Sequence, residues 1–163
     1  MKKIVTVIMS LILVLGLTAC GPTPEQEALI AYVDGDYATL RDLQTEAVTS
    51  YNSVVGKNYD NTVATRAEFA GTTLSAAKLL NEKANEVTAN ITDEGVMGVH
   101  LLYVKYTEVF YEGIQIASGT VQGDPDGSVD KVNDYVKAGN DLLMEHEAKL
   151  KALAEEYEVD LNW

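Results

Sequence analysis

Apolar residues recur three or four positions apart over four long stretches of this chain, with polar residues between them. This spacing places the apolar side chains on one face of an α-helix, and no segment shows the strict alternation that is typical of strands. Breaks rich in Gly, Asn, Asp and Pro separate the stretches. The pattern predicts four helices, over about residues 25–55, 62–91, 96–118 and 129–157.

Each predicted helix has one apolar seam. The first two seams are Leu29, Val33, Tyr37, Leu40, Leu43, Ala47, Tyr51 and Val54, then Ala70, Thr73, Ala77, Leu80, Ala84, Val87 and Ile91. The other two are Val96, Val99, Tyr103, Tyr106, Phe110, Gly113 and Ala117, then Val129, Val132, Val136, Gly139, Leu143, His146, Leu150, Leu153 and Tyr157. Additional apolar residues widen the third seam, so we expect the third helix to be the most buried.

Pairing the helices as hairpins brings large residues opposite small ones. A turn near Gly123 places Tyr106 opposite Gly139 and Gly113 opposite Val132, and a turn at residues 58–59 places Leu40 opposite Ala77. Such layers interdigitate without voids. The sequence therefore predicts an all-α fold, an antiparallel up-down-up-down four-helix bundle. Residues 34–36 (Asp-Gly-Asp) are expected to break or kink the first helix, residues 119–127 to form a loop, and Ser128 or Asp126 to cap the last helix.

The first 21 residues have a different character. Lys2 and Lys3 precede an apolar run over residues 4–17, and Thr18 and Ala19 lead to Cys20 and Gly21. This order is typical of an export signal, and the run is shorter than the ~20 residues that span a membrane. Residues 17–21 (Leu-Thr-Ala-Cys-Gly) resemble the lipobox of bacterial lipoproteins. The resemblance implies cleavage before Cys20, a diacylglycerol on its sulfur, and an extracytoplasmic protein anchored to the cell membrane.

This interpretation divides the chain into a signal peptide (residues 1–19), a lipidated cysteine with a short tether (20–24) and a helical domain (25–163). Because Cys20 is the only cysteine, no disulfide supports the domain. Residues 96–161, which end in Leu-Ala-Glu-Glu-Tyr-Glu-Val-Asp-Leu, resemble the C-terminal hairpin of small, uncharacterised helical lipoproteins of Gram-positive bacteria. That second resemblance implies no catalytic or binding residues.

The charge balance limits the classes of partner. The chain has 12 basic and 25 acidic side chains, a formal charge of −13, and removal of Lys2 and Lys3 would leave −15. Nucleic acids and anionic lipid headgroups are bound through Lys and Arg, so the negative electrostatic field of this chain excludes nucleic-acid binding. It favours solubility and protein partners with basic surfaces.

The strongest candidates for a functional site are His100 and His146, the only two histidines in the sequence. His146 lies in an apolar seam, His100 is expected at the same level, and Tyr103 and Tyr106 are nearby aromatic residues that could bind a ligand or partner. Metal-binding bundles repeat Glu-x-x-His, but Met97 and Leu143 occupy the glutamate positions here. We therefore expect no metal, and a histidine in the core or at its boundary, hydrogen-bonded to a neighbouring side chain, is the simpler interpretation.

Sequence motifs for catalysis are absent: there is no Gly-x-Ser-x-Gly, no phosphate-binding glycine loop and no His-Glu-x-x-His. We expect a non-enzymatic interaction or binding module at the cell envelope, with no cofactor, a membrane anchor on Cys20 and an envelope protein as partner. The alternative is a lipoprotein that binds a small ligand or metal in the interhelical space near His100, Tyr103 and His146.

Overall fold

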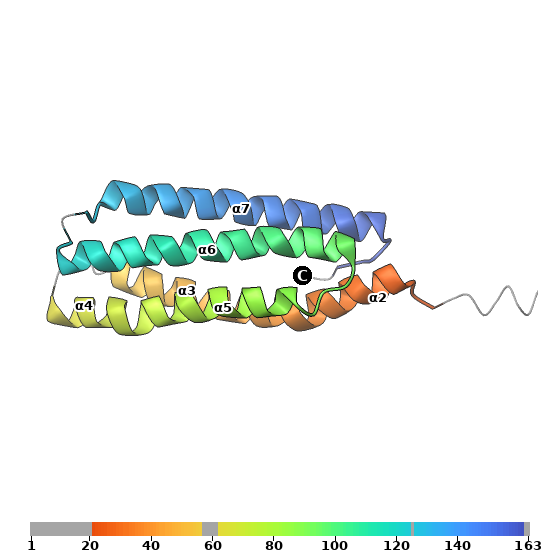
Figure 1. Cartoon of the computed structure of the whole chain (residues 1–163), viewed down its shortest axis with the longest axis horizontal. Helices are drawn as coiled ribbons and strands as arrows, with labels where there is room; N and C mark the ends of the chain where they lie inside the picture. The colour runs from red at the N-terminus through yellow and green to blue at the C-terminus, as the bar shows by residue number, and fades with distance from the viewer. Residues whose placement is uncertain (1–20, 57–61, 125, 162–163) are drawn as a thin grey trace, which may run out of the picture.

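The computed structural model describes residues 21–56, 62–124 and 126–161. These residues are helical, with no strand among them, so the predicted all-α class is confirmed. The helices lie side by side along the long axis of the molecule (Figure 1). The predicted signal peptide, Cys20 and the turn at residues 58–59 lie outside the described residues.

The first predicted helix is present but not regular. It consists of α2 (Pro24–Ala31), the π-helical segment η1 (Tyr32–Tyr37) and α3 (Ala38–Val55). Thr23 caps α2 in a capping box: its hydroxyl accepts from the Gln26 N–H, and the Gln26 side chain accepts from the Thr23 N–H. The expected break at residues 34–36 is instead a π-helical turn, in which the chain stays helical but widens.

The second predicted helix contains a π-helical turn as well. It runs through α4 (Val63–Glu68), η2 (Phe69–Thr73) and α5 (Leu74–Thr88), and Thr62 caps its start. Phe69 and Thr73 are buried in η2, whereas Ala70, which the seam predicted inside, is exposed.

The third helix, α6 (Glu94–Gln122), is the longest uninterrupted α-helix among the described residues and carries the most buried residues. Asp93 caps it by accepting from the Val96 N–H at 2.9 Å. The prediction of a loop from residue 119 was wrong, because the helix continues to Gln122 and buries Val121. It ends at Gly123, whose φ of +83° is the left-handed conformation that a Schellman motif requires, with the Asp124 N–H donating to the Gly119 carbonyl.

The fourth helix, α7 (Val129–Glu156), is capped by Ser128, as the sequence predicts. A Cβ on Gly139 would lie 3.8 Å from the Tyr106 ring, so the predicted contact between these two positions is confirmed. Gly113 meets Tyr135 rather than Val132, because the contact is shifted by about one turn along α7. Val129 and Val136 are exposed, not buried in the seam.

The packing order is α7 on α6, α6 on α5, and α5 on α3 (Figure 1). One large core cluster runs through all of these helices, and a smaller one surrounds Phe69 and Val132. At one end the backbone and side chain of Tyr157 join three elements. Its hydroxyl donates to Asp93 Oδ1 at 3.0 Å, and its carbonyl accepts from Gln26 Nε2 at 2.8 Å.

Candidate functional site

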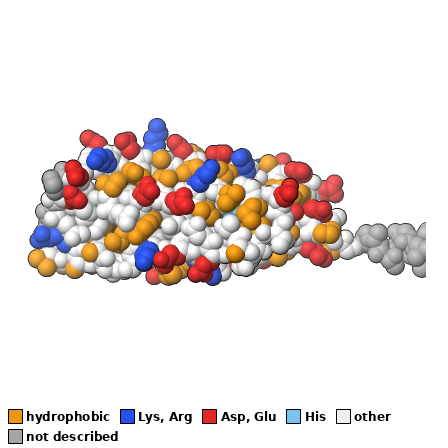
Figure 2. Space-filling model, viewed as in Figure 1, with side chains coloured by type: hydrophobic (Ala, Val, Ile, Leu, Met, Phe, Trp, Pro, Cys, Tyr) orange, Lys and Arg blue, Asp and Glu red, His pale blue; other side chains and the backbone are white. Residues whose placement is uncertain are grey.

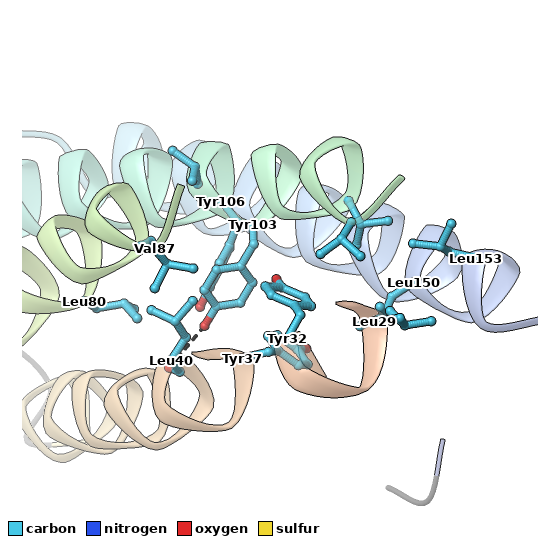
Figure 3. Packing of buried hydrophobic residues seen from close by; sticks show 14 of the residues in the cluster. Leu29, Tyr32, Tyr37, Leu40, Leu80, Val87, Tyr103, Tyr106, Leu150 and Leu153 are labelled. Atoms are coloured by element: carbon cyan, nitrogen blue, oxygen red, sulfur yellow. Dashed lines mark hydrogen bonds between the residues drawn. The ribbon is translucent and has the colours of Figure 1, made fainter. Parts of the chain in front are cut away.

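The four residues proposed as a binding site lie together in the core. His100, Tyr103 and His146 are 0% exposed and Tyr106 is 4% exposed. The ring of Tyr103 lies 5.2 Å from that of His146 and 5.5 Å from that of Tyr106, centroid to centroid. Figure 3 shows these tyrosines between α6 and the first helical stretch. We call this set, with Tyr32 and Tyr37 of η1, the ring cluster.

The two η1 tyrosines complete the cluster. Tyr32 and Tyr37 stack on each other at 5.7 Å, Tyr32 packs edge-on against His100, and Tyr37 lies 5.0 Å from His146. Sequence analysis placed Tyr37 in the seam but missed Tyr32. A regular helix would turn Val33 inward instead, and the signal that could have revealed Tyr32 is the pair of tyrosines five positions apart.

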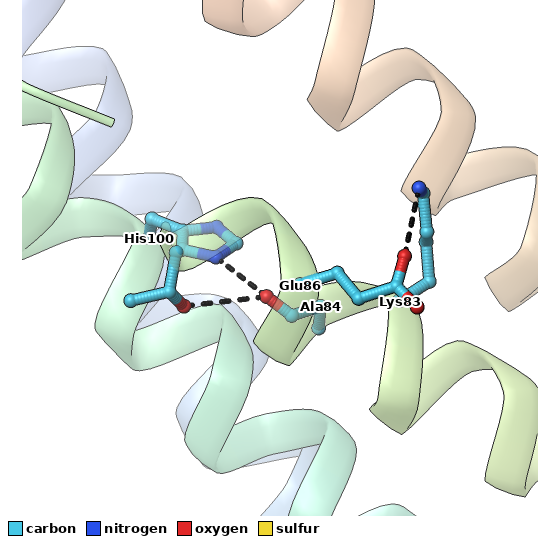
Figure 4. A network of polar contacts seen from close by, with 5 residues as sticks. Lys83, Ala84, Glu86 and His100 are labelled. Atoms are coloured by element: carbon cyan, nitrogen blue, oxygen red, sulfur yellow. Dashed lines mark hydrogen bonds and ion pairs between the residues drawn. The ribbon is translucent and has the colours of Figure 1, made fainter. Parts of the chain in front are cut away.

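His100 is fully hydrogen-bonded. Its Nε2 lies 2.9 Å from the Ala84 carbonyl oxygen (Figure 4), and its Nδ1 lies 3.2 Å from the Tyr32 hydroxyl. Because a carbonyl only accepts, Nε2 carries the hydrogen, and neutral His100 accepts from Tyr32 through Nδ1. Burial lowers the pKa of His100, which favours this neutral form. His100 therefore links α6 to α5 and η1 as a structural residue.

The tyrosines of the ring cluster are also in their neutral forms. The Tyr103 hydroxyl lies 2.8 Å from Gln44 Oε1 and 3.2 Å from the Leu40 carbonyl oxygen. Burial raises the pKa of Tyr103 and of Tyr32 far above the ordinary value, and raises those of Tyr37 and Tyr106 to about 12. None of these phenols is poised to act as a base or nucleophile near neutral pH.

His146 differs from its neighbours. Neither of its ring nitrogens has a hydrogen-bond partner among the described residues, although both are buried. Burial, with a smaller contribution from His100, lowers the pKa of His146 to about 4, so the ring is uncharged at neutral pH. A buried polar group without a partner costs about 1–3 kcal/mol. This is the one polar side chain of the ring cluster whose presence the packing does not explain.

Metal ligands do not gather around His146. Glu145 and Glu147, its neighbours in sequence, are exposed on α7 while the histidine points inward. In the part of the chain that the structure describes, no group of three or more His, Cys, Asp or Glu side chains is close enough to hold a metal ion.

A cavity of about 230 Å³ opens between α3, α6 and α7 and has Tyr106 in its wall. Neither histidine lines it, because both lie deeper in the ring cluster. Among the described helices, none combines the length and the apolar character that crossing a membrane requires.

Comparison of the chain with protein-family models, with curated proteins and with solved structures finds no match.

Proposed function

We propose that this chain is an exported lipoprotein, anchored through Cys20, whose helical domain acts as a non-enzymatic interaction module at the cell envelope. The lipid anchor is inferred from the lipobox-like residues 17–21, and the interaction module is inferred from the helical body. The observation that carries it is the short distance in sequence between Cys20 and the start of helix α2.

Helix α2 begins at Pro24, four residues after Cys20, and the Thr23 capping box fixes its start. Four residues span at most about 14 Å. If Cys20 carries a diacylglycerol, the first turn of α2 lies that close to the membrane surface. Such a short tether suits a module that acts at the surface rather than one that reaches far from it.

We further infer that the helices form an antiparallel, up-down-up-down four-helix bundle. The contacts between α6 and α7 support this arrangement. Moving along α6 from Gly95 to Tyr106 and Gly113, the facing residues on α7 are Leu153, Gly139 and Tyr135, in falling order.

A non-enzymatic role is supported by the state of the core polar groups. The histidines and tyrosines of the ring cluster are buried and neutral, and all of them take part in ring contacts that hold helices together, although His146 makes no hydrogen bond among the described residues.

The surface supports a basic protein partner. On the face in Figure 2, acidic side chains are spread along the molecule with hydrophobic patches between them. The formal charge of −15 that cleavage before Cys20 would leave would attract a partner of opposite charge and accelerate its association.

The proposal is tested by crosslinking in intact producing cells, followed by pull-down of the natural chain and of Cys20→Ser. We expect one or more envelope proteins to be captured with the natural chain and lost with Cys20→Ser. Identical partners for both forms would contradict a role at the membrane surface, and the amount of each form in the cell serves as the control.

The unpaired nitrogens of His146 favour one alternative, metal or small-ligand binding at the ring cluster. Zinc would then raise the melting temperature of the natural chain but not that of His146→Leu. We expect zinc to leave both unchanged.

A further inference from the structure

The side of the fold between α3 and α7 is the least closely packed. The backbone of α3 packs on α5 and that of α7 packs on α6, while α3 and α7 make few close contacts with each other. Side chains must therefore fill the space between α3 and α7, over the surface of α6. At one end Tyr37 and His146 do so, with their ring centroids 5.0 Å apart. At the other end a cavity of about 230 Å³ remains, which we call the cleft.

Two glycines shape the cleft. At Gly113, a Cβ would lie 2.9 Å from the Cβ of Tyr135, so the glycine lets α7 approach α6 there. At Gly139, a Cβ would have only ordinary contacts, 3.8 Å from the Tyr106 ring. The packing of α7 on α6 therefore does not require a glycine at position 139, and the missing side chain leaves space in the wall of the cleft.

The lining is aromatic and uncharged. The rings of Tyr51, Tyr106, Phe110 and Tyr135 contribute to it, together with valines, and the polar residues are Asn52 and Asn140, both exposed. No Asp, Glu, Lys or Arg lines the cleft, although 37 of the 163 residues are of these types. A charged ligand would lose its hydration there without gaining a partner charge.

We propose that the cleft binds a small, uncharged molecule with an aromatic ring and one neutral hydrogen-bonding group. The four rings of the lining favour an aromatic ligand through stacked and edge-on contacts. An amide at the rim, from Asn52 or Asn140, both donates and accepts. An apolar cavity of about 150 Å³ holds benzene, so the volume here suits one or two fused rings and is too small for a partner helix. This inference goes beyond the interaction module proposed above, because it needs neither the anchor nor a protein partner.

The test uses the full chain in lipid nanodiscs, with NMR of labelled isoleucine and valine methyl groups. The probes are indole, benzoate as the charged aromatic control, and 1-hexanol as the neutral aliphatic control. Because the readout is resolved by residue, partition of a probe into the lipid does not imitate binding. We expect indole to shift the methyl signals of Ile114, Val132 and Val136, but not that of Val87 on α5, with a dissociation constant on the order of 1 mM or lower.

The variant Gly139→Leu fills the cleft, and we expect it to weaken indole binding at least tenfold. Gly98→Leu is the matched control: it adds the same side chain to an exposed position of α6 with nothing within 4 Å, and should bind indole as the natural chain does. If Gly139→Leu fails to fold, Gly139→Ala gives a smaller loss, since its Cβ fits against Tyr106.

Three results would overturn the proposal: no shift with indole at several millimolar, equal shifts with benzoate or 1-hexanol, or unchanged indole binding by a folded Gly139→Leu.

Discussion

Two buried histidines on neighbouring helices have opposite hydrogen-bonding states. His100 on α6 donates to Ala84 and accepts from Tyr32, whereas His146 on α7 has no partner among the described residues. Both are neutral near pH 7, because burial lowers the pKa of each. His100 therefore contributes to stability at neutral pH, while His146 reduces it by the unpaired polar atoms that it buries.

This difference predicts that replacing each histidine by leucine has opposite effects on the free energy of unfolding. His146→Leu, which removes the unpaired nitrogens, should raise the free energy of unfolding at pH 7 by about 1–3 kcal/mol. His100→Leu should lower it by a similar amount, because Tyr32 loses its acceptor. Urea unfolding followed by circular dichroism measures both. A His146→Leu protein that is less stable than the natural chain would show that His146 has a polar partner.

The same pKa shifts give a pH dependence. In the unfolded chain His146 binds a proton near its ordinary pKa of 6.5, and in the folded chain only near 4. Above pH 6.5 the ring is neutral in both states, and stability does not depend on this group. As the pH drops from 6.5 to 4 the unfolded chain binds a proton that the folded chain does not, so stability falls, by roughly 3 kcal/mol in all. His146→Leu should remove most of that loss, and the lowered pKa of His100 would account for part of the remainder.

The helical elements depart from regular geometry at η1 and η2. A π-helical turn holds an extra residue, so side chains five positions apart share a face. Tyr32 and Tyr37 are both buried in consequence, while residues 34 and 35 between them are exposed. The π-helical turn accommodates one extra residue, and the α-helices on either side of it keep their regular packing.

Deletion of Gly35 should therefore be tolerated. It would leave the two tyrosines four positions apart, which is the spacing that a regular α-helix needs to bury both. Gly35 is exposed, with nothing within 4 Å of a Cβ, so no packing is lost. Deletion of Glu82, an exposed residue in regular α5, should instead rotate the rest of that helix by about 100° and unfold the protein. Melting temperatures compare the two. Equal destabilisation would contradict the inserted-residue interpretation of η1.

The π-helical turns also explain where sequence-based prediction succeeded and where it failed. Spacings of three and four residues located the four helical stretches and placed Tyr103, Tyr106 and His146 in the buried seams of α6 and α7, and pairing α6 with α7 as a hairpin placed His100 at the level of His146. The burial of Tyr32 and Phe69 was missed, since it depends on a change of helix type. The unpaired state of His146 was missed as well, because it depends on where neighbouring side chains point.

The described part of the molecule is an acidic helical body, and its helix α2 begins four residues after Cys20 in the sequence. Anionic lipid surfaces attract basic segments and repel acidic ones, so the protein surface would not hold this body at a membrane. Two acyl chains on one residue give stable attachment, whereas a single chain gives only marginal binding. In this account the lipid supplies the whole of the attachment, and the helical body supplies the recognition.

The most direct test of the anchored module is the intact mass of the protein extracted from the membranes of a producing bacterium. The account predicts a chain that begins at Cys20 and carries a diacylglycerol, and a Cys20→Ser form that keeps its leader. A natural chain that begins at Met1 and carries no lipid, or one recovered from the cytosol, would contradict it.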